Sequence, residues 1–318
     1  MMFDARERSG AALALGAVCL IGGSVAAATH LHGYPLIGGQ AVRYGLATVF
    51  LLIWARIRRH TFIRPSPAQM AWVFLLAATG MAGYGVVLVY ATSMTSPGNV
   101  GVALGAAPLI IVLVQSLLAQ VRPSRSLMAG ALCVACGSAV AQLSTGGTVQ
   151  WSAQGFAWSC LALTGVCAVT LLGAPATKAL GSLTAITYAC ALASGMLLLT
   201  AVITGSVTGT PVLRRPSGAE LSALAFLALG VTMVVFLMWY GAVERLGTGR
   251  TGLFNGLIPL ASLLALSVTG TATASLNQIA GAALVLMGVA FGLRVRKRDT
   301  PPPRAAAAEH VTGARPHS

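Results

Sequence analysis

Charged side chains are scarce in this sequence: Asp, Glu, Lys and Arg make up 8% of its 318 residues. Soluble domains carry about 25% of such residues. The composition therefore excludes an ordinary soluble globular protein, whose surface needs more charge than this chain contains. Instead, 56% of the residues are hydrophobic and the mean hydropathy is +0.82, which indicates a membrane protein.

Acidic residues are especially rare, since the chain has only six of them. They are Asp4, Glu7, Glu220, Glu244, Asp299 and Glu309, and none lies in the core of a long apolar run. Proton-coupled transport needs a buried group to carry the proton, and no carboxylate is available for this inside a span. If the chain transports a solute, the sequence therefore predicts uniport or exchange rather than obligatory proton antiport. The sequence also lacks an HExxH motif and paired membrane aspartates, which argues against a membrane-embedded enzyme.

Metal and cofactor motifs are also lacking. The six cysteines all lie within apolar runs, and the pair Cys133 and Cys136 has neither a second pair nor a nearby histidine. Cysteines in such surroundings usually pack as small apolar side chains. We therefore expect no metal and no cofactor.

Basic residues are more numerous and give the chain a net charge of +14. They do not form a basic face with interleaved aromatic residues, so we expect no nucleic-acid partner. If the N-terminus is cytoplasmic, all the basic residues except Arg43, Arg214 and Arg215 fall in cytoplasmic segments. The positive-inside rule then places both termini in the cytoplasm.

Apolar runs of about 20 residues, the length needed to span a bilayer as a helix, occur ten times in the chain. They cover residues 10–31, 36–55, 68–93, 98–120, 126–144, 152–173, 182–205, 219–243, 249–270 and 275–294. The sequence thus predicts an all-α polytopic protein with ten transmembrane helices. Residues 1–9 form the predicted cytoplasmic N-terminus, and the basic, Pro- and Ala-rich residues 295–318 form a predicted disordered cytoplasmic tail.

An internal repeat organises these runs. Gly101, Gly105, Pro108, Gly130 and Gly137 recur 151 positions later, as Gly252, Gly256, Pro259, Gly281 and Gly288. Upstream, Gly80/Gly230 and Tyr90/Tyr240 match at an offset of 150, which predicts one residue gained or lost in the short link. Residues 10–144 and 152–294 are the two predicted repeats. Five helices in each is an odd number, so the second repeat enters the membrane from the opposite side, as in many secondary transporters.

The fourth and ninth predicted helices each contain G-x-x-x-G-x-x-P. Gly101 and Gly105, like Gly252 and Gly256, lie one turn apart and allow a neighbouring backbone to approach closely. Pro108 and Pro259 remove a backbone hydrogen bond near mid-span and predict a kink. The glycines could serve packing alone, and the prolines could act as gates or only set the helix shape.

These residues resemble the EamA family of the drug/metabolite transporter superfamily. The stretches from Tyr90 to Pro108 and from Tyr240 to Pro259 carry the resemblance, together with Ala41-Val-Arg43-Tyr. The family often ends its fourth and ninth helices with Gly-Glu, and this chain lacks the acid at both places. The resemblance implies a secondary transporter of small organic solutes, such as amino acids, related metabolites or amphipathic drugs, and an exporter in the cell membrane of a bacterium.

Arg43 is the one charged residue well inside a predicted span, and its charge is costly there without a partner or water. It could neutralise a substrate carboxylate, or it could tether kinked backbone or snorkel to the surface. The other predicted cavity residues are polar or aromatic side chains on apolar helices. They are Tyr84, Tyr90, Gln115, Tyr188 and Asn255.

Three functions are therefore compared. A transporter explains the inverted repeats and the mid-span kinks. A non-transporting membrane sensor or scaffold would need neither, and an enzyme would need reactive groups that the sequence does not bring together. The expected partners of a transporter are a small-molecule substrate and the lipid bilayer, and the chain is expected to be a monomer or a homodimer.

Overall fold

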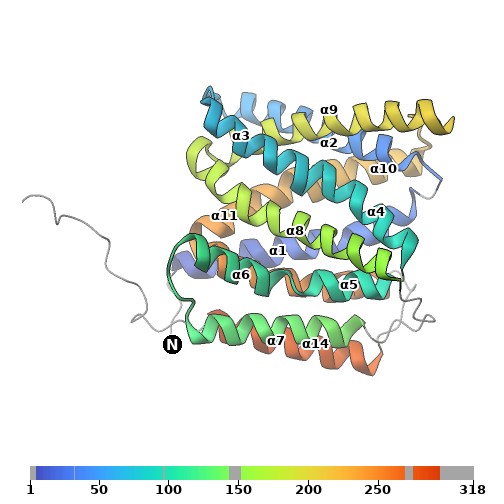
Figure 1. Ribbon diagram of the computed structural model, residues 1–318. Coiled ribbons are helices and arrows are strands. Elements are labelled where there is room, and N and C mark those ends of the chain that lie inside the picture. The colour runs from blue at the N-terminus through green and yellow to red at the C-terminus, as the bar shows by residue number, and fades with distance from the viewer. Residues whose placement is uncertain (1–4, 32, 96, 143–151, 269–274, 294–318) are drawn as a thin grey trace, which may run out of the picture.

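The computed structural model describes residues 5–31, 33–95, 97–142, 152–268 and 275–293. Within these ranges the regular structure is entirely helical and forms ten rods that run side by side (Figure 1). Six rods are single helices and four consist of consecutive segments. The single helices are α1 (Ala5–Thr29), α2 (Leu36–Ile57), α7 (Arg125–Gln142), α8 (Ala153–Leu180), α9 (Ser182–Thr208) and α14 (Leu276–Leu293).

The four interrupted rods are the third, fourth, eighth and ninth along the chain. The third contains α3 (Pro67–Leu75), the π-helix η1 (Leu76–Gly83) and α4 (Tyr84–Met94), and the fourth contains α5 (Pro97–Gly105) and α6 (Ala107–Leu118). The eighth contains α10 (Gly218–Phe226), the π-helix η2 (Leu227–Val234) and α11 (Val235–Leu246). The ninth contains α12 (Thr248–Leu253), the short 3-10 helix η3 (Phe254–Leu257) and α13 (Ile258–Val268).

Seven of these helices are long and apolar enough to cross a membrane by length and composition alone. The prediction of an all-helical protein is confirmed. Helix α1 begins at Ala5, inside the segment predicted as a non-membrane N-terminus, because charged residues can extend a helix past its apolar part. The predicted tail, residues 295–318, lies outside the described residues.

The offset of 151 holds at the beginnings of the third and eighth rods and of their π-helices. Each begins with a capping box, Ser66 with Gln69 in one and Ser217 with Glu220 in the other. The π-helices that follow begin at Leu76 and Leu227. Each of these positions differs from its counterpart by 151, so the predicted shift to an offset of 150 is wrong as far as the π-helices. The two rods end at Met94 and Leu246, which are 152 positions apart.

The contacts between rods also repeat between the two halves of the chain. Two pairs of equivalent rods pack on each other, α7 on α14 and α2 on α9, at opposite edges of the bundle in Figure 1. Between them, α1 packs on α11 of the eighth rod, and its equivalent α8 packs on α4 of the third. Exchanging each rod for its counterpart five places along the chain therefore leaves these contacts unchanged.

The contact between α7 and α14 is made by glycines. A Cβ atom built on Gly130 would lie 2.6 Å from the Gly288 carbonyl oxygen, and one on Gly137 would lie 2.7 Å from that of Gly281. The reverse contacts are equally close, at 2.7 Å for Gly288 and 2.5 Å for Gly281. The earlier glycine of one helix meets the later glycine of the other, so α7 and α14 run antiparallel with their backbones in direct contact.

This contact makes a testable prediction about stability. Gly137→Leu places a side chain where backbone atoms already lie, and overpacking of this kind costs about 1–3 kcal/mol or more. We expect less folded protein and a lower melting temperature in detergent. The matched control is Gly195→Leu on α9, because a Cβ atom there meets nothing within 4 Å. Equal stability of the two variants would contradict the proposed role of the glycine contact.

Candidate functional site

Arg43 is held by neutral partners from two different rods. It lies seven residues after the beginning of α2, about 10 Å along the helix axis. Its Nε donates a hydrogen bond to Thr232 Oγ1 over 2.8 Å, and its Nη1 donates to Gln40 Oε1 over 3.3 Å. The guanidinium also lies 5.4 Å from the centre of the Tyr44 ring. Arg43 thus links the first half of the chain to the second.

Thr232 is available to Arg43 because of its place in η2. The residue is fully buried, and its hydroxyl donates to the carbonyl oxygen of Leu227, five residues earlier. That bond fixes the hydroxyl so that its oxygen accepts from Arg43. π-helical turns of this kind are rare and often occur at functional sites. The equivalent positions in the other half are Met81 for Thr232 and Ser194 for Arg43, so the arginine interaction has no counterpart there.

A small cavity lies beside Arg43, near the N-terminal end of α2. Its volume is about 20 Å³, which is room for about one water molecule, whereas ligand pockets usually have about 300–1,000 Å³. Its lining residues are Leu31, Tyr34, Pro35, Leu36, Gly39, Gln40, Arg43, Leu224 and Leu227. The wall is therefore mostly apolar with one cationic group, and the space is closed to a metabolite in this conformation.

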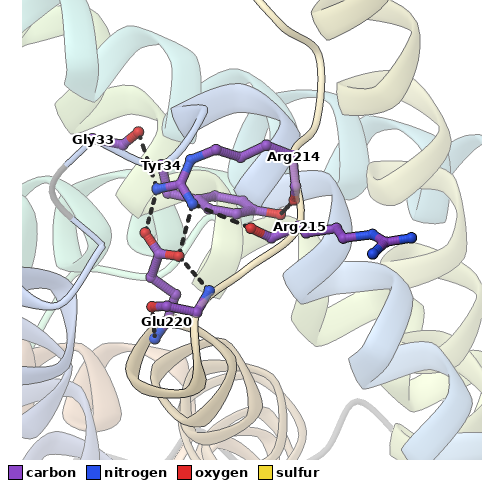
Figure 2. Close-up of polar contacts among 6 residues, drawn as sticks. Gly33, Tyr34, Arg214, Arg215 and Glu220 are labelled. Carbon is purple, nitrogen blue, oxygen red and sulfur yellow. Dashed lines mark hydrogen bonds and ion pairs between the residues drawn. The ribbon is translucent and has the colours of Figure 1, made fainter.

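An ion pair lies beside Tyr34, one of the residues that line this cavity (Figure 2). The guanidinium of Arg214 binds both carboxylate oxygens of Glu220, which also accepts a hydrogen bond from the backbone N–H of Ser217 over 2.7 Å. Arg214 in turn lies 5.0 Å from the centre of the Tyr34 ring, and the Tyr34 hydroxyl donates to the Arg214 carbonyl oxygen over 3.1 Å. The cluster thus joins the α1–α2 connection to the α9–α10 connection.

The ion pair is uneven in exposure, since the Arg214 side chain is 41% exposed and that of Glu220 is 8% exposed. The hydrogen bonds to Glu220 raise the pKa of Arg214, so the pair stays charged at any physiological pH. Solvent screens the exposed arginine, so we assign the pair a small part of the stability and a larger part in fixing the position of Tyr34.

The other predicted cavity residues do not all gather around Arg43. Tyr84 packs against α8, where a Cβ atom built on Gly165 would lie 2.8 Å from the Tyr84 Cβ atom. Tyr90 stacks on Trp158 and is 43% exposed, while Tyr188 packs its ring edge near Phe62. The remaining two lie on the fourth and ninth rods, where Gln115 packs against Gly249 and the Nδ2 atom of Asn255 is buried without a hydrogen-bond partner.

The repeated prolines coincide with interruptions of their rods. Pro108 is the second residue of α6, after a turn at Ala106, and Pro259 is the second residue of α13, after η3. The repeated glycines are in close contact with neighbouring rods. A Cβ atom would meet Gln142 at Gly101, Ser138 at Gly105, Ile111 at Gly252 and Val134 at Gly256, all within 3.0 Å. Their participation in transport remains a prediction.

Sequence reasoning missed Tyr34, Thr232 and the partnership of Arg214 with Glu220. The pattern Ser-x-x-Glu at 217–220 could have indicated the capped helix that positions Glu220. Thr232 gave no signal, because a threonine in an apolar helix usually bonds its own backbone.

Comparisons with known proteins agree with this architecture. Residues 8–142 match the model of the EamA-like transporter family. The "Uncharacterized transporter YetK" of Bacillus subtilis (strain 168) is 22% identical over 312 residues, which cover 96% of this chain and 93% of that protein. The "Uncharacterized transporter YyaM" of the same organism is 24% identical over 279 residues, 82% of this chain and 86% of that protein.

A solved structure, titled only "Crystal structure of protein", shares the fold with a TM-score of 0.78. It is 20% identical and covers 89% of this chain and 96% of its own. The family match to residues 8–142 and the two transporter relatives agree with the resemblance found in the sequence. Together they indicate a multi-pass membrane transporter that is similar to the EamA-like family.

The ion pair leads to a testable prediction, and the equivalent position in the other repeat provides the control variant. Glu220→Gln keeps the helix cap, since Gln69 caps the equivalent helix in the same way, but it removes the charge that holds Arg214. We expect little change in the melting temperature, because solvent screens the pair, and faster hydrogen exchange in residues 209–217. Gln69→Glu, where Ile63 occupies the position equivalent to Arg214, should leave exchange in residues 209–217 unchanged. Unchanged exchange in Glu220→Gln would show that the pair does not hold the segment.

Proposed function

We propose that this protein is a secondary transporter that exports small organic solutes across the cytoplasmic membrane of a bacterium by alternating access. The solute classes are amino acids, related metabolites and amphipathic drugs. The observation that carries the proposal is the antiparallel, reciprocal packing of equivalent helices, seen most closely where Gly130 and Gly137 of α7 meet Gly288 and Gly281 of α14. Two halves related in this way can exchange conformations and so open the pathway to either side.

The topology follows from the same pairing. We infer ten membrane spans in two inverted halves, 10–144 and 152–294, with both chain termini in the cytoplasm. Antiparallel packing of α7 on α14 supports the inversion, and the distribution of arginines supports the orientation. Inverted five-helix halves also favour transport over a sensor or scaffold, because neither alternative requires two exchangeable halves.

Ion pairs at both ends of the bundle support a closed, occluded conformation. At the outer end, Arg214 and Glu220 hold Tyr34 over the Arg43 cavity. At the inner end, Arg250 of α12 donates to Glu7 of α1 over 2.9 Å. Each cluster joins a segment of the first half to one of the second, so opening either side requires its contacts to separate.

The topology is testable with single cysteines and a membrane-impermeant thiol reagent. In intact cells we expect labelling of Thr210→Cys in the α9–α10 connection, and no labelling of Thr61→Cys or Pro123→Cys until the cells are opened. The native cysteines lie within the helices, and the unaltered chain provides the background signal. The reverse labelling pattern would overturn the inferred orientation.

The repeated prolines give a prediction about transport itself. Pro→Ala restores a backbone N–H donor and allows the rod to straighten, so folding should tolerate Pro108→Ala and Pro259→Ala. Because the prolines are equivalent in two inverted halves, each change should favour one access state, and the two biases should be opposite. We expect each variant to lower the initial flux of radiolabelled solute in liposomes while purified yield and solute binding are retained.

The double variant provides the control for that experiment. Because the two biases are opposite, they should cancel in the double variant. The populations of the two access states should then be balanced again, while the initial flux should remain low. Full flux in both single variants would reduce the prolines to a role in helix shape. Absence of flux for every metabolite tested, together with absence of any thermal shift on binding, would remove the support for a transporter.

A further inference from the structure

We propose that Arg43 is the binding site for a carboxylate group of the transported solute, and that Tyr34 covers this site from the outer side. The inference rests on the proposed transport function and specifies the chemistry of the solute. It predicts that the protein discriminates an organic acid from the neutral or amidated analogue of the same shape.

Among the described residues, no carboxylate forms an ion pair with Arg43. An arginine has five N–H donors, and the recorded side-chain hydrogen bonds of Arg43 go to the neutral atoms Thr232 Oγ1 and Gln40 Oε1. Of the two ion pairs recorded among the described residues, neither includes Arg43. The nearby carboxylate of Glu220 is held by Arg214 instead. A cation in an apolar span therefore retains the capacity to bind an anion.

The neutral partners also orient the guanidinium. Thr232 is fixed by its own bond to Leu227, and it binds the Nε edge of Arg43 at 2.8 Å. Further N–H donors remain on a side chain that lines the cavity. Arginine binds carboxylates through pairs of parallel N–H···O bonds, and a preset orientation lowers the entropy lost on binding. The leucines that complete the wall suit a hydrocarbon group and make the local electrostatic attraction stronger than in water.

Tyr34 forms the cover of the cavity. Its side chain is largely buried, lines the cavity and packs against Gly39, where a Cβ atom would lie 3.1 Å from the ring. Arg214 lies against the same ring and is held in place by Glu220 (Figure 2). The present volume, about 20 Å³, holds about one water molecule, so a carboxylate reaches Arg43 from outside only after Tyr34 moves.

The site is single although the fold is repeated. Ser194 occupies the position equivalent to Arg43, and its hydroxyl donates to the Ala41 carbonyl oxygen instead of binding across the bundle to the third rod. Met81, equivalent to Thr232, has no hydroxyl to offer. One transporter should therefore bind one carboxylate, which fixes the expected stoichiometry at one.

The test compares acids with their amides on the purified full-length protein in lipid nanodiscs. The probes are benzoate with benzamide, and leucine with leucinamide, measured by isothermal titration calorimetry. We expect the acid of at least one pair to bind with a stoichiometry of one and at least about 10-fold more tightly than its amide, the size expected for a hydrogen bond to a charged group. Arg43→Gln should abolish this preference, while Arg43→Lys should retain part of it.

Arg215→Gln is the matched control, because it removes a neighbouring exposed arginine whose side chain does not line the cavity. It should leave the preference for acids unchanged. If Arg43→Gln does not fold, Arg43→Lys decides, since a lysine cannot reproduce the paired hydrogen bonds and must bind the acid more weakly. Tyr34→Ala should accelerate both binding and release of the acid without changing the preference for acid over amide.

Several outcomes overturn the inference. Equal affinity for acid and amide in the unaltered protein would do so, as would an unchanged affinity for the acid in Arg43→Gln or Arg43→Lys, or no binding of any acid probe. If amides or other uncharged solutes are still transported in liposomes, the transport function stands and only the carboxylate site is rejected. If no solute of either kind binds or moves, the transport function itself fails.

Discussion

The reciprocal glycine contact between α7 and α14 is the constraint on which the rest of the structure depends. Gly130 and Gly137 meet Gly288 and Gly281 so closely that a Cβ atom on any of them would overlap backbone. Inside a bilayer, helices gain little from burying apolar surface against each other, so close backbone packing stabilises their association instead. Gly130 contacts the equivalent of Gly137, and Gly137 contacts the equivalent of Gly130. The contact is therefore possible only if the two equivalent helices run antiparallel.

Polar groups make the two halves different. Arg43 binds across the bundle whereas Ser194 caps a neighbouring backbone carbonyl, and Glu220 holds an arginine whereas Gln69 only caps its helix. The repeated apolar and glycine positions thus set the architecture, and the positions that differ set the chemistry. A single arginine without an equivalent in the other half makes the two ends of the bundle chemically different, which a perfectly symmetric pair of halves would not be.

The repeat, the all-helical fold and the position of Pro108 and Pro259 next to helix interruptions could be read from the sequence, because each depends on local pattern. The alignment of the third rod with the eighth could not be read from the sequence in this way. The identities Gly80/Gly230 and Tyr90/Tyr240 favour an offset of 150, whereas the capping boxes of the two rods align at 151. Polar residues such as Tyr90 and Tyr188 were predicted as cavity residues, but identity alone does not tell which face of a helix they occupy. The bond from Arg43 to Thr232 depends on the π-helix that presents the hydroxyl, which no periodicity indicates.

The cost of a charge in an apolar surrounding connects these features to transport. A cation inside a span costs at least about 2.5 kcal/mol even on the mildest scale, and water or an anion reduces that cost. In this conformation the cavity beside Arg43 has room for about one water molecule, so the empty protein retains much of the penalty. A bound carboxylate removes more of it than a single water does. Closure is therefore more favourable with solute present than without it, because a ligand shifts a conformational equilibrium by its differential affinity for the two states. A carrier that closes mainly when loaded crosses between its access states with solute bound, which is the behaviour that exchange requires.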